Sequence, residues 1–435
     1  MAEDATNNVL TRVVVLGLFG YRRVDFRLDA DEPTILTGSN GAGKSTVLRM
    51  IDAFCTGRWE VLRKLPFEQL TMYFADTLPV HVKMNDGDLT VGSKGRKTWK
   101  AMPVPDELLR RIWARESMRM NQPPSFADFE SSPSYDELLR RATASDRAIY
   151  RHLLASGETT DTPSWLSELT GRVPVLFVTD QRLVIEATAR ERRERGAETA
   201  LRVADEAVEH VRKLMADSLS EYAAVSQRLD RDFPQRVVAA MRRGVDISDD
   251  DLAQQLRDNE AQALALERVG LLPEGAPTGV FTDFGSKNEK PVVATHAADT
   301  GRKLAVLSSL RHRLSLFGEF LSQHYRTKSV VFDPQAGFYL SAPGMKQLAP
   351  RELSSGEQQM LVLAYQILFK AEPGTLVLID EPELSLHVIW QSSFVDDITR
   401  MGTERNLRFL LATHSPTLLG GREDLRRSLD EAPSE

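Results

Sequence analysis

A glycine-rich segment near the N-terminus has the residues of a phosphate-binding loop. Residues 38–45 read Gly-Ser-Asn-Gly-Ala-Gly-Lys-Ser and match the pattern G-x-x-x-x-G-K-S. In such a loop the backbone N–H groups surround a phosphate, and the following helix adds the partial positive charge of its N-terminus. We predict that Lys44 reaches the β- and γ-phosphates and that Ser45 is a ligand of Mg²⁺; the alternative is a plain glycine turn. The predicted cofactor-binding residues of this loop are Gly38, Ser39, Asn40, Gly41, Ala42, Gly43, Lys44, Ser45 and Thr46.

Two carboxylates follow an apolar run in the C-terminal part of the chain. The run Leu-Val-Leu-Ile at 376–379 is typical of a strand buried on both faces, and Asp380 and Glu381 come directly after it. Ligands of an open α/β sheet bind at this carboxyl edge. We therefore predict that Asp380 holds Mg²⁺, directly or through water, and that Glu381 orients and deprotonates the attacking water.

A third motif, Ser-Ser-Gly-Glu-Gln at 354–358, precedes the apolar segment 360–369. Ser354 with Glu357, or Ser355 with Gln358, fits a capping box at an ordinary helix start. A Ser-Gly helix N-terminus is also a site where an anion can bind.

The flanking sequence predicts the elements that position these motifs. Segments 13–16, 21–28 and 34–37 have strand patterns, and the last leads into the glycine loop, which segment 47–51 continues as a helix. Residues 68–100 form a β-rich lobe, with Asn-Asp-Gly-Asp at 85–88 as a hairpin turn. Further strands are predicted at 173–178, 330–332 and 338–340.

The middle of the chain is predicted to be helical. A helix over 190–233 has heptad character and ends at Pro234, and a returning segment from Leu307 to Leu321 has the same spacing. The two segments can pair as a short antiparallel arm. Asp249, Asp250 and Asp251 are interpreted as the solvated start of a further helix.

Together with Ala-Thr-His-Ser-Pro at 412–416, these motifs resemble an ATP-binding-cassette type ATPase head. More narrowly, Asp-Glu-Pro-Glu-Leu-Ser-Leu-His at 380–387 and Thr-His-Ser-Pro at 413–416 resemble SMC-like, OLD-type AAA ATPases of DNA repair and bacterial phage defence, including the PARIS and Septu types. The motifs cover the two ends of the chain, and the middle matches only as a helical insertion.

The resemblance implies ATP and Mg²⁺ as cofactors and an ATP-dependent dimer or higher assembly. It implies that Ser354, Ser355, Gly356 and Glu357 contact the γ-phosphate held by the partner subunit, and that His414 senses the γ-phosphate. A lone histidine can equally be structural.

The resemblance also implies a glutamine that touches Mg²⁺ and the attacking water. We assign this role to Gln181, with Gln69 as the rival, and a plain polar cap is the alternative for Gln181. Ser385 and His387 match the segment that faces the other subunit, and Val388 departs from the proline that is frequent there.

The predicted fold class is α/β: an ABC-type P-loop ATPase head, with a β-rich lobe and an α/β core, interrupted by helical insertions that include a short antiparallel coiled-coil arm. Residues 1–100 are expected to hold the N-terminal half of the head, 101–170 a helical insertion and 171–185 a core strand with Gln181. Residues 186–326 are expected to form the arm, and 327–435 the C-terminal half of the head.

Composition restricts the class of protein. The 435 residues carry 55 Lys and Arg against 62 Asp and Glu, a net charge of −7, which does not indicate a dedicated nucleic-acid or membrane-surface protein. The single cysteine, Cys55, allows no disulfide within a monomer, and the absence of a signal or apolar span predicts a cytoplasmic protein. Lys94, Arg96, Lys97 and Lys100 form a local basic patch that could contact DNA or a partner.

Three functions follow as hypotheses. The first is an ATP-hydrolysing switch that controls a separate effector, such as a nuclease or toxin, in anti-phage defence. We expect that effector to be a partner, because the 21 residues after His414 are too few for a nuclease domain. The second is an SMC-like DNA-repair ATPase that clamps DNA, and the third is a scaffold that ATP closes without a need for hydrolysis. A transporter ATPase subunit fits poorly because of the arm and the 382–387 segment.

Overall fold

The structure is a computed structural model that describes residues 8–101, 162–179, 189–273, 275, 289–325, 327–384 and 388–430. The chain divides into two compact units. Unit 1 combines residues Met1–Thr199 with Lys370–Glu435, and unit 2 comprises Ala200–Phe369. Unit 1 is therefore assembled from both ends of the chain.

The core of unit 1 is a parallel sheet with the strand order β14-β3-β13-β12-β8. Its strands are β3 (Thr34–Thr37), β8 (Val175–Thr179), β12 (Leu376–Asp380), β13 (Arg408–Ala412) and β14 (Arg426–Ser428), and every neighbouring pair is parallel. The strand segments predicted at 34–37, 173–178 and 376–379 are confirmed. Because the strands are parallel, their carboxyl ends meet at one edge, which is where the predicted site residues lie.

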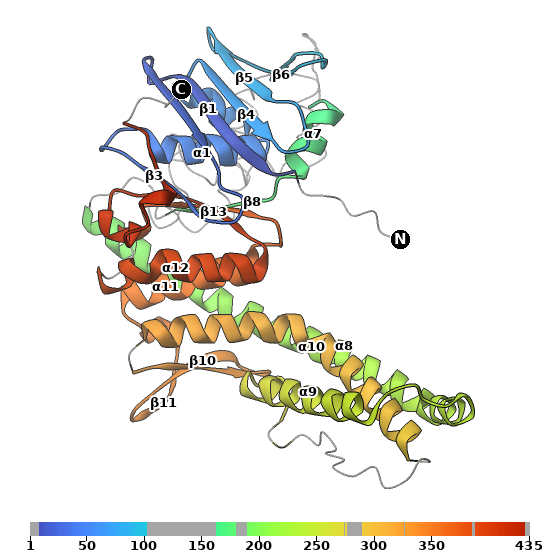
Figure 1. Ribbon diagram of the computed structural model, residues 1–435. Coiled ribbons are helices and arrows are strands. Elements are labelled where there is room, and N and C mark those ends of the chain that lie inside the picture. Colours follow the sequence, from blue (N-terminus) through green and yellow to red (C-terminus); the bar gives the residue numbers. More distant parts are fainter. Residues whose placement is uncertain are drawn as a thin grey trace, which may run out of the picture. The chain divides into compact units, whose positions relative to one another are not determined.

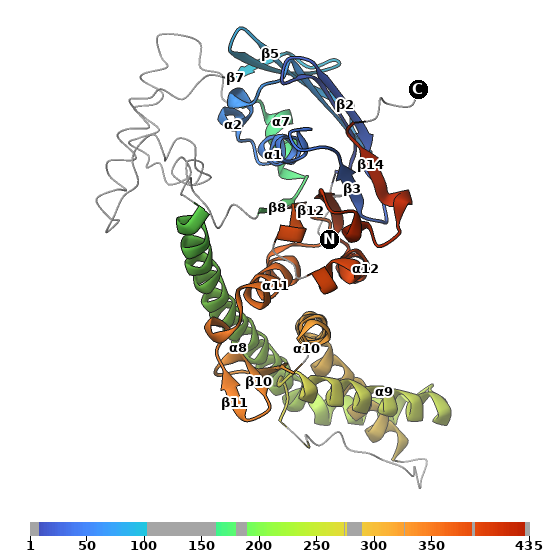
Figure 2. The ribbon, with the colours of Figure 1, turned by 90° about the vertical axis from the view of Figure 1, so that its left-hand side faces the viewer.

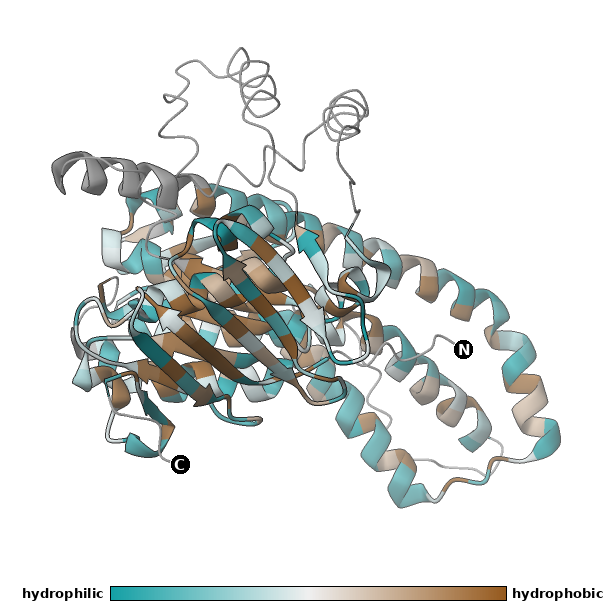
Figure 3. Ribbon diagram, turned by 90° about the horizontal axis from the view of Figure 1, so that it is seen from above, coloured by the Kyte–Doolittle hydropathy of each residue, from teal (hydrophilic) through white to brown (hydrophobic). Residues whose placement is uncertain are grey.

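A second sheet in unit 1 is antiparallel and has the order β2-β1-β4-β5-β6-β7. Its strands are β1 (Leu10–Leu18), β2 (Arg22–Arg27), β4 (Gln69–Phe74), β5 (Val80–Asn85), β6 (Asp88–Ser93) and β7 (Trp99–Ala101). Figure 3 shows apolar and polar residues alternating along these strands, as expected for a sheet with one buried face. Asp86 and Gly87 both have positive φ, at 49° and 84°, so the predicted hairpin turn is confirmed.

Helix α1 (Lys44–Cys55) packs between the two sheets (Figure 1). Its fully buried residues include Met50, Ile51 and Phe54, and the same apolar cluster contains Leu378 of the parallel sheet and Val15 of the antiparallel sheet. This cluster fixes the start of α1, and with it the glycine loop, against the sheet edge. The shorter helices α2 (Trp59–Lys64) and α7 (Ser164–Gly171) contribute residues to the same apolar cluster.

Helix α12 (Val388–Arg405) covers the opposite face of the parallel sheet (Figure 1). Alternate strand residues such as Val377, Ile379 and Phe409 point away from the α1 cluster and are buried. Burial on both faces explains why β12 reads as an unbroken apolar run rather than an alternating one. Short 3-10 turns at Pro382–Leu384, Pro416–Leu419 and Glu423–Leu425 connect the strands near their carboxyl ends.

Unit 2 contains three long helices, α8 (Ala189–Arg243, whose first residues belong to unit 1), α9 (Asp249–Arg268) and α10 (Lys290–His324), seen beside one another in Figure 2. Helix α8 has 55 residues and is about 80 Å long at about 1.5 Å per residue. Two ion pairs join α8 to α10: Arg236 with Asp299, and Asp230 with Lys303. The residue that comes earlier in α8 pairs with the one that comes later in α10, so the two helices are antiparallel, as predicted.

Two features of the arm differ from the sequence prediction. Helix α8 does not end at Pro234 but continues to Arg243, and Arg236 donates to the backbone carbonyl of Leu229 one turn before the proline. Helix α9 is a third member of the arm and lies parallel to α10, since Lys290 pairs with Asp249 and Asn259 donates to the carbonyl of Ala297. Asp249–Asp251 open α9, with Ser248 as the N-cap, as expected.

The remainder of unit 2 is a small antiparallel sheet and a capped helix. The sheet has the order β11-β10-β9, from strands β9 (Ser329–Asp333), β10 (Gly337–Ala342) and β11 (Met345–Leu348). It is followed by a 3-10 turn at Pro350–Glu352, by α11 (Ser355–Tyr365) and by a π-helical turn at Gln366–Lys370. Phe317 packs edge-to-face against Phe338 and Phe369, which joins α10 to the sheet and to the π-helical turn after α11.

Among the described residues, no helix combines the length and the apolar character that crossing a membrane requires.

Candidate functional site

The glycine loop has the predicted strand-loop-helix context. Strand β3 ends at Thr37 and α1 begins at Lys44, and Gly38, Gly41 and Gly43 all have positive φ. At Gly43 (φ 96°) a side chain would also meet Leu18, because an added Cβ would lie 2.6 Å from its Cδ2 atom. This position therefore needs glycine for both its backbone conformation and its close packing.

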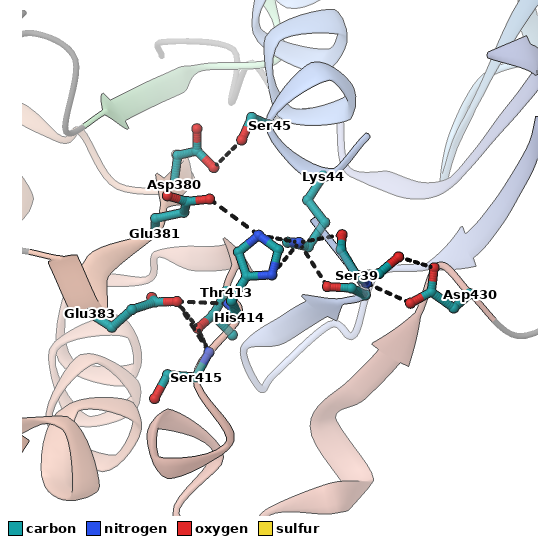
Figure 4. Close-up of polar contacts among 11 residues, drawn as sticks. Ser39, Lys44, Ser45, Asp380, Glu381, Glu383, Thr413, His414, Ser415 and Asp430 are labelled. Carbon is teal, nitrogen blue, oxygen red and sulfur yellow. Dashed lines mark hydrogen bonds and ion pairs between the residues drawn. The ribbon is translucent and has the colours of Figure 1, made fainter. Parts of the chain in front are cut away.

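Lys44 lies inside the loop and is only 3% exposed. Its Nζ donates to the carbonyl of Gly38 at 3.0 Å and lies 2.7 Å from Nε2 of His414 (Figure 4). Burial lowers the pKa of Lys44, and the nearby carboxylates of Glu381 and Asp380 partly oppose this shift. A partly desolvated ammonium group surrounded by acceptors is well placed to exchange them for phosphate oxygens.

Ser45 and Asp380 are brought together from opposite ends of the chain. The Ser45 hydroxyl donates to Oδ1 of Asp380 at 2.8 Å (Figure 4). Burial raises the pKa of Asp380 to about 6, and the neighbouring charge of Glu381 adds to this effect, while the bond from Ser45 opposes it. Burial disfavours the charged form of Asp380, and a bound cation would favour it.

These two oxygen donors fit Mg²⁺, which prefers carboxylate and hydroxyl oxygens together with phosphate oxygens and water. The described residues contain no group of three or more His, Cys, Asp or Glu side chains that could hold a metal by themselves. A Mg²⁺ ion held by Ser45 and Asp380 would thus need the phosphates of a nucleotide to complete its coordination.

Glu381 has an unusual backbone. Its φ is 47°, in the left-handed region, where residues other than glycine are uncommon. Its N–H donates to the carbonyl of Ala412 at 2.8 Å, and its Oε1 lies 3.3 Å from Nε2 of His414. Such conformations are costly and collect at functional sites. The turn directs the carboxylate toward Lys44 and His414, as Figure 4 shows.

The loop that carries His414 is held by Glu383, a residue that the sequence analysis did not single out. One oxygen of Glu383, Oε1, accepts from the Thr413 hydroxyl at 2.7 Å, the His414 N–H at 2.7 Å and the Ser415 N–H at 3.2 Å. A carboxylate that accepts three bonds fixes the backbone on which the imidazole stands. The only sign of this role in the sequence is that Glu383 lies two residues after the predicted general base, Glu381.

The other end of the glycine loop is held by two further residues that the sequence analysis missed. The carboxylate of Asp430 accepts from the Ser39 N–H at 2.5 Å and from the Ser39 hydroxyl at 3.1 Å. Arg22 donates to the carbonyl of Ala42 at 3.1 Å and to Asp430 at 3.3 Å. A cavity of about 410 Å³ adjoins this point, lined among others by Gly38, His414 and Asp430.

The Ser-Ser-Gly-Glu-Gln motif lies in unit 2, at the start of α11. Ser354 is the N-cap and forms a capping box with Glu357, so the first of the two predicted pairings is confirmed. Glu357 also accepts from Lys328 at 2.5 Å, and its backbone carbonyl accepts from the hydroxyl of Tyr325. Ser354 and Ser355 remain exposed, whereas Gly356 and Glu357 are half-buried.

Three predicted residues, Gln181, Ser385 and His387, lie outside the described residues. Gln181 follows β8, which ends at Thr179 beside Asp380 in the sheet register. The rival Gln69 begins β4 in the antiparallel sheet, where its amide donates to Thr71.

One family model matches part of the chain. Residues 223–420 match the family described as "AAA domain, putative AbiEii toxin, Type IV TA system", which is less than half of the chain. No curated protein matches the chain. The family match supports nucleotide binding by an AAA-type ATPase domain.

Among solved structures, the chain is similar to SMC head domains. One is the Smc head domain with an extended coiled coil, bound to the C-terminal domain of ScpA, from Pyrococcus furiosus (13% identity, 95% of this chain and 91% of that chain, TM-score 0.38). Another is the SMC head domain from Thermotoga maritima (11% identity, 94% and 91%, TM-score 0.33). The α/β fold class rests on the sheet order and the glycine loop described above.

Proposed function

We propose that this protein is a Mg²⁺-dependent ATPase that acts as a molecular switch. The observation that carries the proposal is the meeting of Lys44, Glu381 and His414 at one sheet edge, beside the paired oxygens of Ser45 and Asp380. Each residue type suits phosphoryl transfer to water, in which positioning and charge stabilisation supply nearly all of the catalysis.

In this proposal each residue has one role. Lys44 and the loop N–H groups bind the β- and γ-phosphates, and Ser45 and Asp380 hold Mg²⁺, which neutralises phosphate charge when bound. Glu381 accepts a hydrogen bond from the attacking water and takes its proton, and His414 donates to the γ-phosphate. Gln181 is proposed to contact the same water and Mg²⁺.

Substitution of Glu381 by Gln tests this proposal. We expect hydrolysis to fall about 10²- to 10⁴-fold, the range for loss of a general base, while ATP binding persists. Glu423→Gln is the matched control, because Glu423 lines the cavity of the same unit without contacting Glu381. Wild-type turnover in Glu381→Gln would contradict the role of Glu381.

We further propose that ATP joins two subunits. Ser354, Ser355, Gly356 and Glu357 would contact the γ-phosphate held by the partner, since the exposed serines stand at a helix N-terminus that suits an anion. The Glu381→Gln protein with ATP should then elute as a dimer or higher assembly in light-scattering chromatography. Adding Ser355→Arg should return it to the monomer, and persistence of the assembly would count against this interface.

The proposed biological role is control of a separate effector in anti-phage defence. It draws support from the family description, which names a toxin of a Type IV toxin–antitoxin system. We expect the trapped Glu381→Gln assembly to retain or release a co-purifying partner differently from the wild type, with a matching change in phage resistance. Unchanged partner release and resistance would favour the scaffold alternative, in which ATP binding alone closes the assembly.

A DNA-clamping ATPase is the second candidate, favoured by the exposed turn between β6 and β7. Lys94, Arg96 and Lys97 lie on this turn and are exposed, while Lys100 pairs with Asp88 at 2.5 Å. Neutralising all four should weaken ATP-dependent DNA binding and reduce its salt dependence. Neutralising Arg231, Arg242, Arg243 and Lys213 on α8 is a control with the same charge change. Equal DNA binding by all three proteins would count against this function.

A further inference from the structure

A carboxylate from the C-terminal end of unit 1 occupies a backbone donor of the phosphate-binding loop. Asp430 follows β14, and its two oxygens accept from the N–H and the hydroxyl of Ser39, the second residue of the loop (Figure 4). The bond from the N–H is 2.5 Å long, which is short even for a charged acceptor. Asp430 therefore takes up a donor of the type that a phosphate would use.

The surroundings hold this carboxylate in place and keep it charged. Arg22 bridges from the carbonyl of Ala42, inside the loop, to Oδ1 of Asp430. Hydrogen bonding from the Ser39 N–H is the largest of the effects that lower the pKa of Asp430, and the charge of Arg22 contributes as well. The backbone is also fixed, because the N–H of Leu429 donates to the carbonyl of Thr37 directly before the loop.

We propose that Asp430 is an affinity-setting residue of the nucleotide site, whose carboxylate must leave Ser39 when the phosphates of ATP enter the loop. The proposal rests on the proposed function, since it assumes that ATP is the ligand. A bound triphosphate brings several negative charges close to a carboxylate that already holds one loop donor. Part of the binding free energy of ATP is then used to displace Asp430.

The displaced carboxylate of Asp430 can move into a neighbouring cavity. The side chain of Asp430 is 40% exposed, and the cavity of about 410 Å³ beside it is also lined by Ser428 and Arg426. Displacement needs rotation of one side chain, and the strand pairing of β14 with β3 can stay intact. Nucleotide binding would thus change the position of the Asp430 side chain, which directly follows β14.

The test compares Asp430→Asn and Asp430→Ala with the wild type by calorimetric titration of Mg²⁺-ATP. Both variants should bind ATP about 3- to 10-fold more tightly, because the competing charge is removed. Glu423→Gln is the matched control, as it removes a carboxylate from the same cavity without touching Ser39, and it should leave the affinity unchanged. Asp430→Glu keeps the charge and should stay close to the wild type.

A second measurement needs no nucleotide. Hydrogen exchange of the peptide that contains Ser39 should be faster in Asp430→Ala than in the wild type, because the N–H loses its acceptor. Unchanged or weakened ATP binding in both Asp430→Asn and Asp430→Ala overturns the proposal. Absence of ATP binding by every variant and by the wild type removes the proposed function as well, so the two failures are distinguishable.

Discussion

The two helix N-termini that we propose to bind phosphate differ in the contacts that hold them. The glycine loop before α1 contacts residues from distant parts of unit 1, including His414 and Asp430. The motif before α11 is capped by its own serine, and Ser354 and Ser355 remain exposed. The proposed function assigns the first to a nucleotide bound within one subunit and the second to the nucleotide of a partner subunit.

The supports of the two sites differ as well. The loop rests on a sheet that is buried on both faces, so its position is fixed by apolar packing. The start of α11 is joined to the end of the arm by polar bonds, from Lys328 and from Tyr325 at the end of α10, both to Glu357. A change at the end of α10 can therefore reach the start of α11 directly through Glu357.

The largest effect that separates the two sites is expected from Lys44→Met. Removing the ammonium group should lower ATP affinity by about 100-fold, because a charge-assisted bond to phosphate is lost at a buried position. Titration with Mg²⁺-ATP measures the loss, and circular dichroism monitors the fold. Ser355→Arg at the exposed motif is the contrasting variant and should bind ATP as a monomer at wild-type strength. Equal loss in both variants would contradict the distinction.

A smaller effect is expected from Lys328→Met, which removes the ion pair with Glu357. Burial of Glu357 by itself raises its pKa, but the bonds from Lys328 and Ser354 more than offset this, so the pKa is lowered. A lowered carboxyl pKa adds stability above the pKa of the unfolded chain, and this stability is lost as the pH falls through the lowered value. The wild type should exceed Lys328→Met in unfolding free energy at pH 7 by about 1 kcal/mol, after allowance for partial exposure.

Denaturant titration at several pH values checks this prediction. The difference between the two proteins should shrink below the ordinary carboxyl pKa of about 4. Lys303→Met is the matched control, since its partner Asp230 is 67% exposed and should contribute little at any pH. A difference that stays constant down to pH 3 would show that Lys328 acts by packing instead.

The smallest effect is expected from Ser354→Ala. Loss of the N-cap should destabilise α11 by about 1 kcal/mol, while ATP affinity stays within about twofold of the wild type, because the proposed ATP site is the glycine loop of unit 1. Steady-state hydrolysis should still fall if the motif meets a partner's nucleotide. Unchanged hydrolysis at saturating ATP would mean that the motif is only a helix start. Ser354→Asp restores a cap and serves as the stability control.

Sequence patterns predicted the candidate site residues that lie close together in the chain. The glycine loop, the pair Asp380 and Glu381, and the serine cap each lie within a few residues, so strand and helix patterns placed them correctly. The patterns missed Arg22, Glu383 and Asp430, because each acts through contacts that the tertiary fold creates between segments far apart in the chain. Asp430 lies 391 residues from Ser39, and no local pattern marks that pairing.

The arm shows the same limit. The heptad spacing identified the antiparallel pairing of α8 with α10, but it gave no place to α9, whose contact depends on Asn259 and Leu252 facing α10. Pro234 was interpreted as the end of a helix because proline removes one backbone bond. The helix continues because the neighbouring turns retain their bonds and Arg236 supplies an additional donor nearby.

The assembly of unit 1 from both chain ends has a consequence for biosynthesis. The partners of β3 in the sheet are β13 and β14, which leave the ribosome long after the glycine loop has been made. Contacts between such distant segments form late and slowly. The parallel sheet that supports the glycine loop and α1 is therefore incomplete while the arm helices are synthesised. A nascent chain thus cannot complete the proposed nucleotide site until β13 and β14 have emerged.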